Sequence, residues 1–162
     1  MSQANGGGMI RLGGIARQGV IGVLQGVLTD MIDLFTHAKV AHWNVKGPAF
    51  IALHELFDQI AERAEDHADT LAERIAALGG RVEGTARHTA GASRLGPYPA
   101  AAADWAAHAR ALAAALAVAG GHARQGIDDA SAMKDAASAD VLTEVVRDLD
   151  KDLWLVESHL GV

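Results

Sequence analysis

The chain has 162 residues, a formal net charge of −6 and no cysteine. Its length suits one domain with a substantial hydrophobic core, and the lack of cysteine excludes disulfide scaffolds, zinc fingers, thiol catalysis and iron–sulfur ligation. The excess of acidic residues disfavours a surface that simply coats nucleic acid and suits a protein that attracts cations.

The N-terminal residues 1–14 are rich in glycine and are predicted to form a flexible tail before one folded domain over 15–162. The tail has no apolar region followed by a cleavage site, so it does not resemble a signal peptide. The most apolar stretch, Ala111–Gly121, is 11 residues long, whereas a membrane span needs about 20. We therefore expect a cytoplasmic protein with no membrane partner.

Abundant alanine and few aromatic residues (4%) favour helix over sheet. The first helix is predicted over 15–44, where apolar residues recur every three or four positions, and Gly47-Pro48 follows its end. The second helix begins after that proline and ends at Gly79-Gly80. The apolar stripes of the two helices consist of Val20, Leu24, Val27, Met31, Leu34, Phe35 and Ala38, and of Leu53, Phe57, Ile60, Ala64, Ala68, Leu71, Ile75 and Leu78.

A long link over 81–99 follows, with room for one short helical turn. The third helix is predicted over 101–125. Residues 126–137, which include Gly126 and several aspartates, are expected to interrupt the chain before a fourth helix over 138–159. Two long helices, a long crossover and two more helices describe an all-α protein with a ferritin-like four-helix bundle.

The second helix also carries a stripe of polar side chains that faces away from its apolar stripe. Counting about 100° per residue, four members lie about 100–200° from Leu53; they are His54, Asp58, Asp69 and Glu73. They form two i,i+4 pairs, each of which can point at one metal ion. The pairs are separated by roughly 16 Å along the helix axis, so one ion cannot use both. An ordinary solvated acidic face is the alternative interpretation.

A second copy of this helix, laid antiparallel about a two-fold axis, would bring the two pairs together. Facing residues in such a contact have numbers that add to a constant. The numbers of His54 and Glu73 add to 127, and so do those of Asp58 and Asp69. The spacing therefore predicts a two-fold homodimer with two metal sites, each shared between the subunits.

One further candidate ligand, His42, lies near the end of the first helix, with Trp43 beside it. Taken alone, a histidine at such a place is more often a hydrogen-bonded core residue. Combined with His54 and the carboxylates, it gives a mixed imidazole and carboxylate set without sulfur. That set suits Fe(II) with open positions, and also Zn or Mn.

Three segments together resemble the signature of the Dps proteins, the mini-ferritins also called DNA-binding proteins from starved cells. They are HWNVKGPAFIALHELFD (His42–Asp58), DTLAER (Asp69–Arg74) and the closing RDLDKDLWLVES (Arg147–Ser158). The likeness covers nearly the whole chain. It implies a hollow dodecamer with ferroxidase centres at its two-fold interfaces. One subunit would supply His42, His54 and Asp58, and its neighbour would supply Asp69 and Glu73.

The resemblance also implies the chemistry, which is oxidation of Fe(II) by hydrogen peroxide or oxygen and storage of ferric mineral as a protection against oxidative stress. Iron is then the expected metal, with no organic cofactor. In such proteins a tryptophan, here Trp43, lies next to the centre. Lys39, one helical turn before Trp43, is a candidate supporting group.

Iron enters such shells through acidic pores on a three-fold axis, near the start of the fourth helix. The candidates in this chain are Asp128, Asp129, Asp135 and Asp140. A solvated loop that caps a helix explains each of these aspartates equally well when it is considered alone.

Several members of the family bind DNA through a mobile tail rich in lysine and arginine, whose phosphate contacts are sensitive to salt. The N-terminal segment of this chain offers only Arg11 in the tail and Arg17 just after it, and no lysine precedes Lys39. A charge of −6 per subunit also repels DNA. We expect weak DNA binding or none, and a non-enzymatic, DNA-compacting Dps protein is the alternative function.

Three other interpretations fit the sequence less well. His54–Asp58 reads HExxD, but the second histidine of the HExxH metalloprotease motif is missing. A purely structural bundle leaves the shared sum of 127 unexplained. A ferritin centre within one subunit needs Glu-x-x-His on bundle helices, and this spacing does not occur in the chain.

Overall fold

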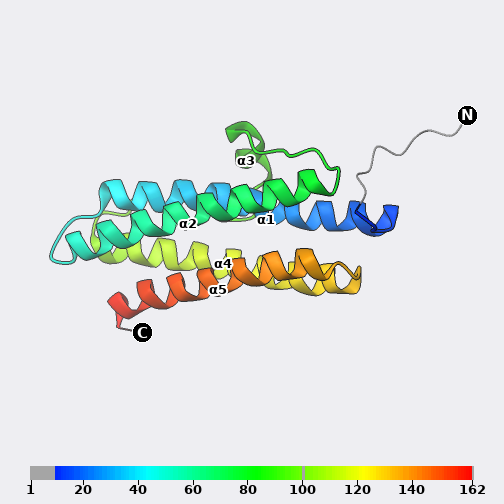
Figure 1. Cartoon of the computed structure of the whole chain (residues 1–162). Helices are drawn as coiled ribbons and strands as arrows, with labels where there is room; N and C mark the ends of the chain where they lie inside the picture. The colour runs from blue at the N-terminus through cyan, green and yellow to red at the C-terminus, as the bar shows by residue number, and fades with distance from the viewer. Residues whose placement is uncertain (1–9, 100, 162) are drawn as a thin grey trace, which may run out of the picture.

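The computed structural model describes residues 10–99 and 101–161, and every regular element among them is a helix. In chain order the helices are α1 (Gly14–Asn44), α2 (Phe50–Ala77), α3 (Ala86–Ala92), α4 (Trp105–Ala132) and α5 (Ala136–Leu160). The four long helices run alongside one another, α1 next to α2 and α4 next to α5, and the short α3 lies outside the bundle (Figure 1). The predicted four-helix bundle with a long crossover is confirmed, and most of the predicted tail, residues 1–9, lies outside the described residues.

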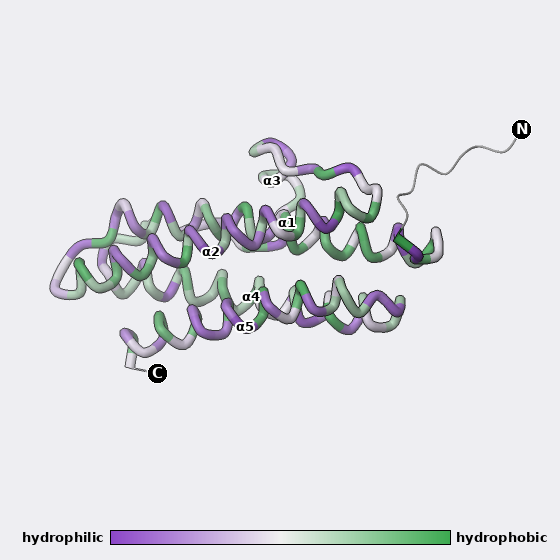
Figure 2. Tube along the Cα trace, in the orientation of Figure 1, coloured by the Kyte–Doolittle hydropathy of each residue, from purple (hydrophilic) through white to green (hydrophobic). Residues whose placement is uncertain are grey.

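The core forms where the apolar stripes of the long helices meet. The stripes predicted for α1 and α2 are buried, apart from Phe35 and Ala68, which are half-buried against the same core. Figure 2 shows hydrophobic and hydrophilic residues alternating along each long helix, as expected for helices with one buried side. Each fully buried leucine or phenylalanine contributes about 1.5–3 kcal/mol, so these stripes determine the arrangement of the bundle.

The turn between α1 and α2 reverses the chain direction and fixes how the two helices meet. Gly47 has φ of 107°, a left-handed conformation that glycine adopts without strain. A Cβ atom there would also lie 3.3 Å from Cδ1 of Trp105, the first residue of α4. The turn therefore packs against α4 and holds the end of α1 beside the start of α2.

The predicted interruption between the third and fourth helices is wrong over its first half. α4 continues through Gly126 to Ala132. A Cβ atom on Gly126 would lie 3.1 Å from Val23 and 3.2 Å from Leu142, so the glycine permits close packing of three helices. The break comes at Lys134, the one non-glycine residue with positive φ (61°) among the described residues.

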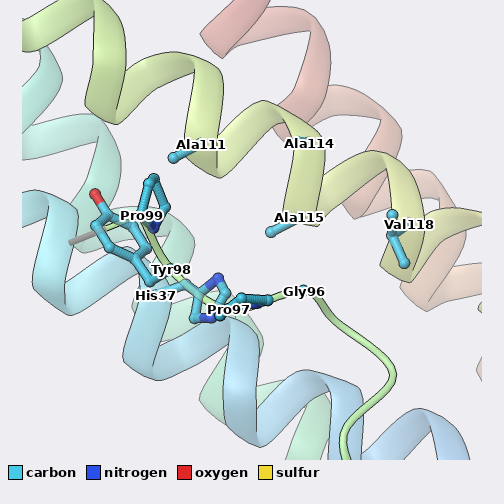
Figure 3. A pocket seen from close by; sticks show the side chains of 9 residues that line it. All are labelled: His37, Gly96, Pro97, Tyr98, Pro99, Ala111, Ala114, Ala115 and Val118. Carbon is cyan, nitrogen blue, oxygen red and sulfur yellow. The ribbon is translucent and has the colours of Figure 1, made fainter. Parts of the chain in front are cut away.

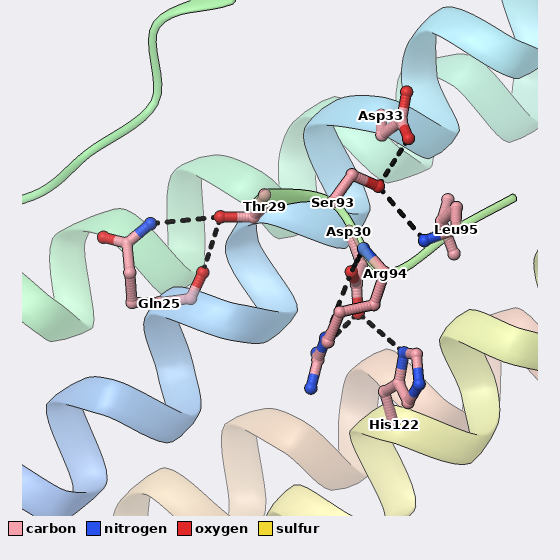
Figure 4. A network of polar contacts seen from close by, with 8 residues as sticks. All are labelled: Gln25, Thr29, Asp30, Asp33, Ser93, Arg94, Leu95 and His122. Carbon is pink, nitrogen blue, oxygen red and sulfur yellow. Dashed lines mark hydrogen bonds and ion pairs between the residues drawn. The ribbon is translucent and has the colours of Figure 1, made fainter. Parts of the chain in front are cut away.

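The crossover is fastened to the bundle by a buried carboxylate on α1 (Figure 4). Asp30 is fully buried and accepts hydrogen bonds from the Arg94 guanidinium, at 2.5 Å, and from His122 Nδ1 on α4, at 3.0 Å. One turn further along α1, Asp33 accepts a hydrogen bond from the Ser93 hydroxyl. These contacts connect the end of the crossover to both halves of the bundle.

Among the described residues, α1 is the one helix long and apolar enough to cross a membrane by length and composition alone. The shorter stretch Ala111–Gly121 is therefore not the segment that meets this criterion. The buried face of α1 packs against α2 and α4 inside the bundle, and a core helix of this length meets the same criterion.

Candidate metal centre

Two of the predicted ligands meet where α1 ends and α2 begins. His42 lies in the last turn of α1 and His54 near the start of α2. Their rings stack with centroids 3.8 Å apart and planes 19° from parallel. The turn through Gly47 brings the two side chains together, because it places the first turns of α2 directly beside the last turns of α1.

Each histidine is held by the backbone of the other. His42 Nδ1 lies 2.7 Å from the carbonyl oxygen of His54, and His54 Nδ1 lies 3.0 Å from the carbonyl oxygen of His42. A carbonyl oxygen can only accept, so both Nδ1 atoms carry the hydrogen and donate it. In the neutral form of each ring, Nε2 then keeps a free lone pair, as in histidines that bind metals while their other nitrogen donates to a carbonyl. Each imidazole of the pair could therefore offer its Nε2 atom to a metal ion.

The third predicted ligand, Asp58, lies one turn beyond His54. Its Oδ1 atom is 2.6 Å from Nζ of Lys39 and 4.0 Å from Nδ1 of His42. The hydrogen bond from Lys39 lowers the pKa of Asp58 below its ordinary value, and burial acts in the opposite direction. Asp58 is therefore a carboxylate over the whole physiological pH range, ready to bind a cation.

Asp69 and Glu73 do not join this group within one chain. Both are exposed, further along α2, and the 11 residues from Asp58 to Asp69 span roughly 16 Å of helix. Within 10–99 and 101–161, no three histidine, aspartate or glutamate side chains are arranged to hold a metal ion by themselves. The candidate ligands that do lie together in one chain are His42, His54 and Asp58, and this incomplete group is called the half-centre below.

Exposed apolar side chains surround this half-centre. Trp43 is 67% exposed and Ile51 is 61% exposed. Phe50, also exposed, lies with its ring 4.9 Å from that of His54. Clustered apolar side chains at the surface are typical of a contact with another protein, and this contact would lie at the edge of the half-centre.

The geometry adds two features that the sequence reasoning missed. The sequence predicts that Lys39 lies near Trp43, and its Nζ atom is 5.9 Å from that ring, but the sequence does not predict its hydrogen bond to Asp58. The backbone carbonyls that orient the two histidines were also missed. Both depend on how α1 packs against α2, and neither has a signal in the local sequence.

The four candidate pore residues differ in their surroundings. Asp128 and Asp140 are exposed, and Asp129 accepts a hydrogen bond from Gln125 Nε2 at 3.0 Å. Asp135 is buried, caps α5 through Ser138, and has both carboxylate oxygens 3.0 Å from Nη2 of Arg74. Asp135 thus has a structural role within the chain, and the pore hypothesis now depends on the other three aspartates.

A cavity of about 350 Å³ lies away from the half-centre, between the end of the crossover and α4 (Figure 3). Its lining is mainly proline, alanine and valine, and His37 and Tyr98 are its polar members. The Tyr98 hydroxyl is already paired with Nδ1 of His108 at 2.6 Å, and burial raises the pKa of Tyr98 to about 12. None of the predicted ligands lines this cavity, so it offers no second candidate for the metal centre.

Comparison with known proteins agrees with this architecture. A family model described as a ferritin-like domain matches residues 21–162. The DNA protection during starvation protein of Agrobacterium fabrum is 39% identical over 145 residues, which cover 90% of each chain. The corresponding protein of Mycolicibacterium smegmatis is 33% identical over 141 residues, 87% of this chain and 76% of that one.

Solved structures give the same result. DpsA14 from Streptomyces coelicolor superposes with a TM-score of 0.89 at 36% identity, over 94% of this chain and 90% of that one. Dps from Microbacterium arborescens, solved in a high iron form, has a TM-score of 0.86 at 34% identity and covers 94% of this chain and 100% of its own. Fold, length and sequence identity therefore agree that this chain belongs to the ferritin-like family and, within it, to the Dps proteins.

Proposed function

We propose that this protein is a mini-ferritin that oxidises Fe(II), with hydrogen peroxide as its main oxidant, and stores the ferric product as mineral. The oxidation takes place at ferroxidase centres between subunits. The subunits form a hollow homo-oligomer, which the resemblance to Dps proteins implies to be a dodecamer. The protein acts in the cytoplasm, where removal of iron and peroxide together limits oxidative damage.

The reciprocal pairing of His42 and His54 carries this proposal. Two imidazoles with free Nε2 atoms lie one turn from the carboxylate of Asp58, at a surface edged by exposed apolar side chains. Such a half-centre needs further ligands, and the antiparallel register predicted from the sequence supplies Asp69 and Glu73 of the partner subunit. Five ligands from two chains then make a site of imidazole and carboxylate donors, which suits iron.

Each group has a distinct part in the reaction. The histidines bind Fe(II) through Nε2, and the carboxylates balance the added positive charge as Fe(III) forms. Two Fe(II) ions give one electron each to a peroxide molecule, and two protons complete its conversion into two molecules of water. Because the electrons are transferred as a pair, no hydroxyl radical is released.

Anaerobic iron loading of the purified protein tests this proposal. Size-exclusion chromatography first gives the oligomeric state, and Fe(II) is then added before peroxide or air. We expect a large oligomer that oxidises iron faster than a protein-free control, with peroxide faster than air. The double substitution His54→Ala and Asp58→Ala should abolish the fast phase.

Asp66→Ala is the matched control, because Asp66 is an exposed carboxylate on the same helix and is not a proposed ligand. It should oxidise iron at the rate of the natural protein. A monomer in solution, or oxidation no faster than in the protein-free control, would refute the proposed function.

A further inference from the structure

We propose that the ammonium group of Lys39 serves as a built-in cation in the iron-free centre, and that incoming metal displaces it from Asp58. This inference rests on the proposed function and concerns how the half-centre is kept ready for iron. Lys39 is then a positioning residue that sets how tightly and how selectively the centre binds its first divalent ion.

The three ligands of the half-centre are held in different ways. His42 and His54 are fixed by backbone carbonyls, which stay in place as long as α1 packs against α2. Within the described part of the chain, the one side chain that donates a hydrogen bond to Asp58 is Lys39, at 2.6 Å. Asp58 is therefore the ligand whose position depends on a flexible, charged side chain.

The ammonium group of Lys39 also has a second favourable contact, with the ring of Trp43. Its Nζ atom lies 5.9 Å from the centroid of the Trp43 ring, within the range at which an ammonium is attracted to an aromatic face. The Lys39 and Asp58 side chains are 24% and 39% exposed, so neither is locked in a packed interior. The ammonium can leave Asp58 and remain over Trp43 without losing all of its favourable contacts.

Charge supplies the reason for the exchange. The proposed centre combines Asp58 with Asp69 and Glu73 of the partner subunit, and three carboxylates in one place repel one another. Lys39 offsets part of this repulsion while no metal is present. A divalent ion attracts the carboxylates more strongly and repels the ammonium, so the lysine leaves when the metal arrives.

Anaerobic binding of Co(II), followed by calorimetry, tests this exchange without any oxidation. Three single variants of the full chain are compared with the natural protein. Lys39→Met removes the charge and keeps the length, Lys39→Arg keeps the charge, and Lys151→Met removes an exposed charge from α5. We expect Lys39→Met to bind Co(II) about two- to fivefold more tightly, and the other two variants to bind within about twofold of the natural protein.

The melting temperature without metal provides the second measurement. Lys39→Met should melt at a lower temperature than the natural protein when metal-free and should gain more stability when Co(II) is added, because the carboxylates lose their cation. If Lys39 only supports the fold, the variant will bind Co(II) equally or more weakly, and the inference is then wrong. If the natural protein itself binds no Co(II), or binds it no better than a fourth variant, His54→Ala, the proposed function fails instead.

Discussion

Two aspartates, Asp58 and Asp135, show how its surroundings determine whether a carboxylate can bind a metal or serves only to hold helices together. Each forms a hydrogen bond with a basic side chain, Lys39 in one case and Arg74 in the other, and each has a pKa below its ordinary value. Asp58 is at the surface with a flexible partner, so it is free to change ligands. Asp135 is buried at a helix terminus, and both of its carboxylate oxygens lie 3.0 Å from Nη2 of Arg74, so it acts as a fixed joint between α2 and α5.

The joint at Asp135 gives a pH-dependent prediction. Burial alone would raise the pKa of Asp135, but hydrogen bonds from Ser138 and Arg74 outweigh it and lower the pKa. A depressed pKa means that the ion pair contributes its full stability above the ordinary value and loses it as the pH falls through the lowered value. Asp135→Asn, which can still cap the helix, should therefore melt well below the natural protein at pH 7.

That difference should shrink at an acidic pH below the lowered pKa of Asp135, where this residue is protonated in the natural protein as well. Thermal unfolding followed by circular dichroism at both pH values measures it. Asp140→Asn, an exposed position four residues into α5, is the control and should match the natural protein at both. An equal difference at the two pH values would contradict the assigned ion pair.

At the level of the helices, the sequence predicts most of what the structure contains. The stripes from Val20 to Ala38 and from Leu53 to Leu78 identify α1 and α2, because spacing of three and four is enough to define a buried helical face. The helix break predicted at Gly126 is wrong. Glycine weakens a helix in isolation, but this glycine packs against Val23 and Leu142, and that contact depends on two other helices. The contact of Lys39 with Asp58 has the same origin, because it appears only when α1 and α2 are packed.

Gly126 supports a prediction about the stability of α4. Gly126→Val should lower the free energy of unfolding by about 1–3 kcal/mol, because the added methyl groups meet Val23 and Leu142 at 3.1–3.2 Å or less. Gly121→Ala, five residues earlier in the same helix, has nothing within 4 Å of the new methyl group. It should stabilise the helix by about 0.5–1 kcal/mol, so urea unfolding should move the two variants in opposite directions.

At the level of the whole molecule, the half-centre bears on how subunits assemble, and the net charge bears on which partners the protein attracts. The structure of one chain shows three candidate ligands together and leaves Asp69 and Glu73 exposed at the other end of α2. The spacing in the sequence predicts that a second copy completes the centre, because residue numbers that share one sum are compatible with an antiparallel two-fold contact. The orientation of the ligands could not be predicted, since it comes from backbone carbonyls that any sequence possesses.

The net charge leads to a prediction about DNA. A charge of −6 per subunit is multiplied in an oligomer, and phosphate contacts need a surplus of lysine and arginine. The purified protein should therefore leave the mobility of plasmid DNA unchanged in an agarose gel at neutral pH and moderate salt. A clear shift under these conditions would favour the DNA-compacting alternative.

We also expect exposed acidic side chains to help Fe(II) ions enter the oligomer. Asp128 and Asp140 are exposed on either side of the turn between α4 and α5, and carboxylates around a pore would concentrate Fe(II) there. The double substitution Asp128→Asn and Asp140→Asn should slow iron uptake while size-exclusion chromatography shows an unchanged oligomer. The control is Asp150→Asn, which removes one negative charge at a position far from that turn. Asp150 is an exposed acid in the middle of α5 and pairs with Arg124. Uptake followed by stopped-flow absorbance should be slower only in the double variant, and equal rates in all three proteins would exclude this entry route.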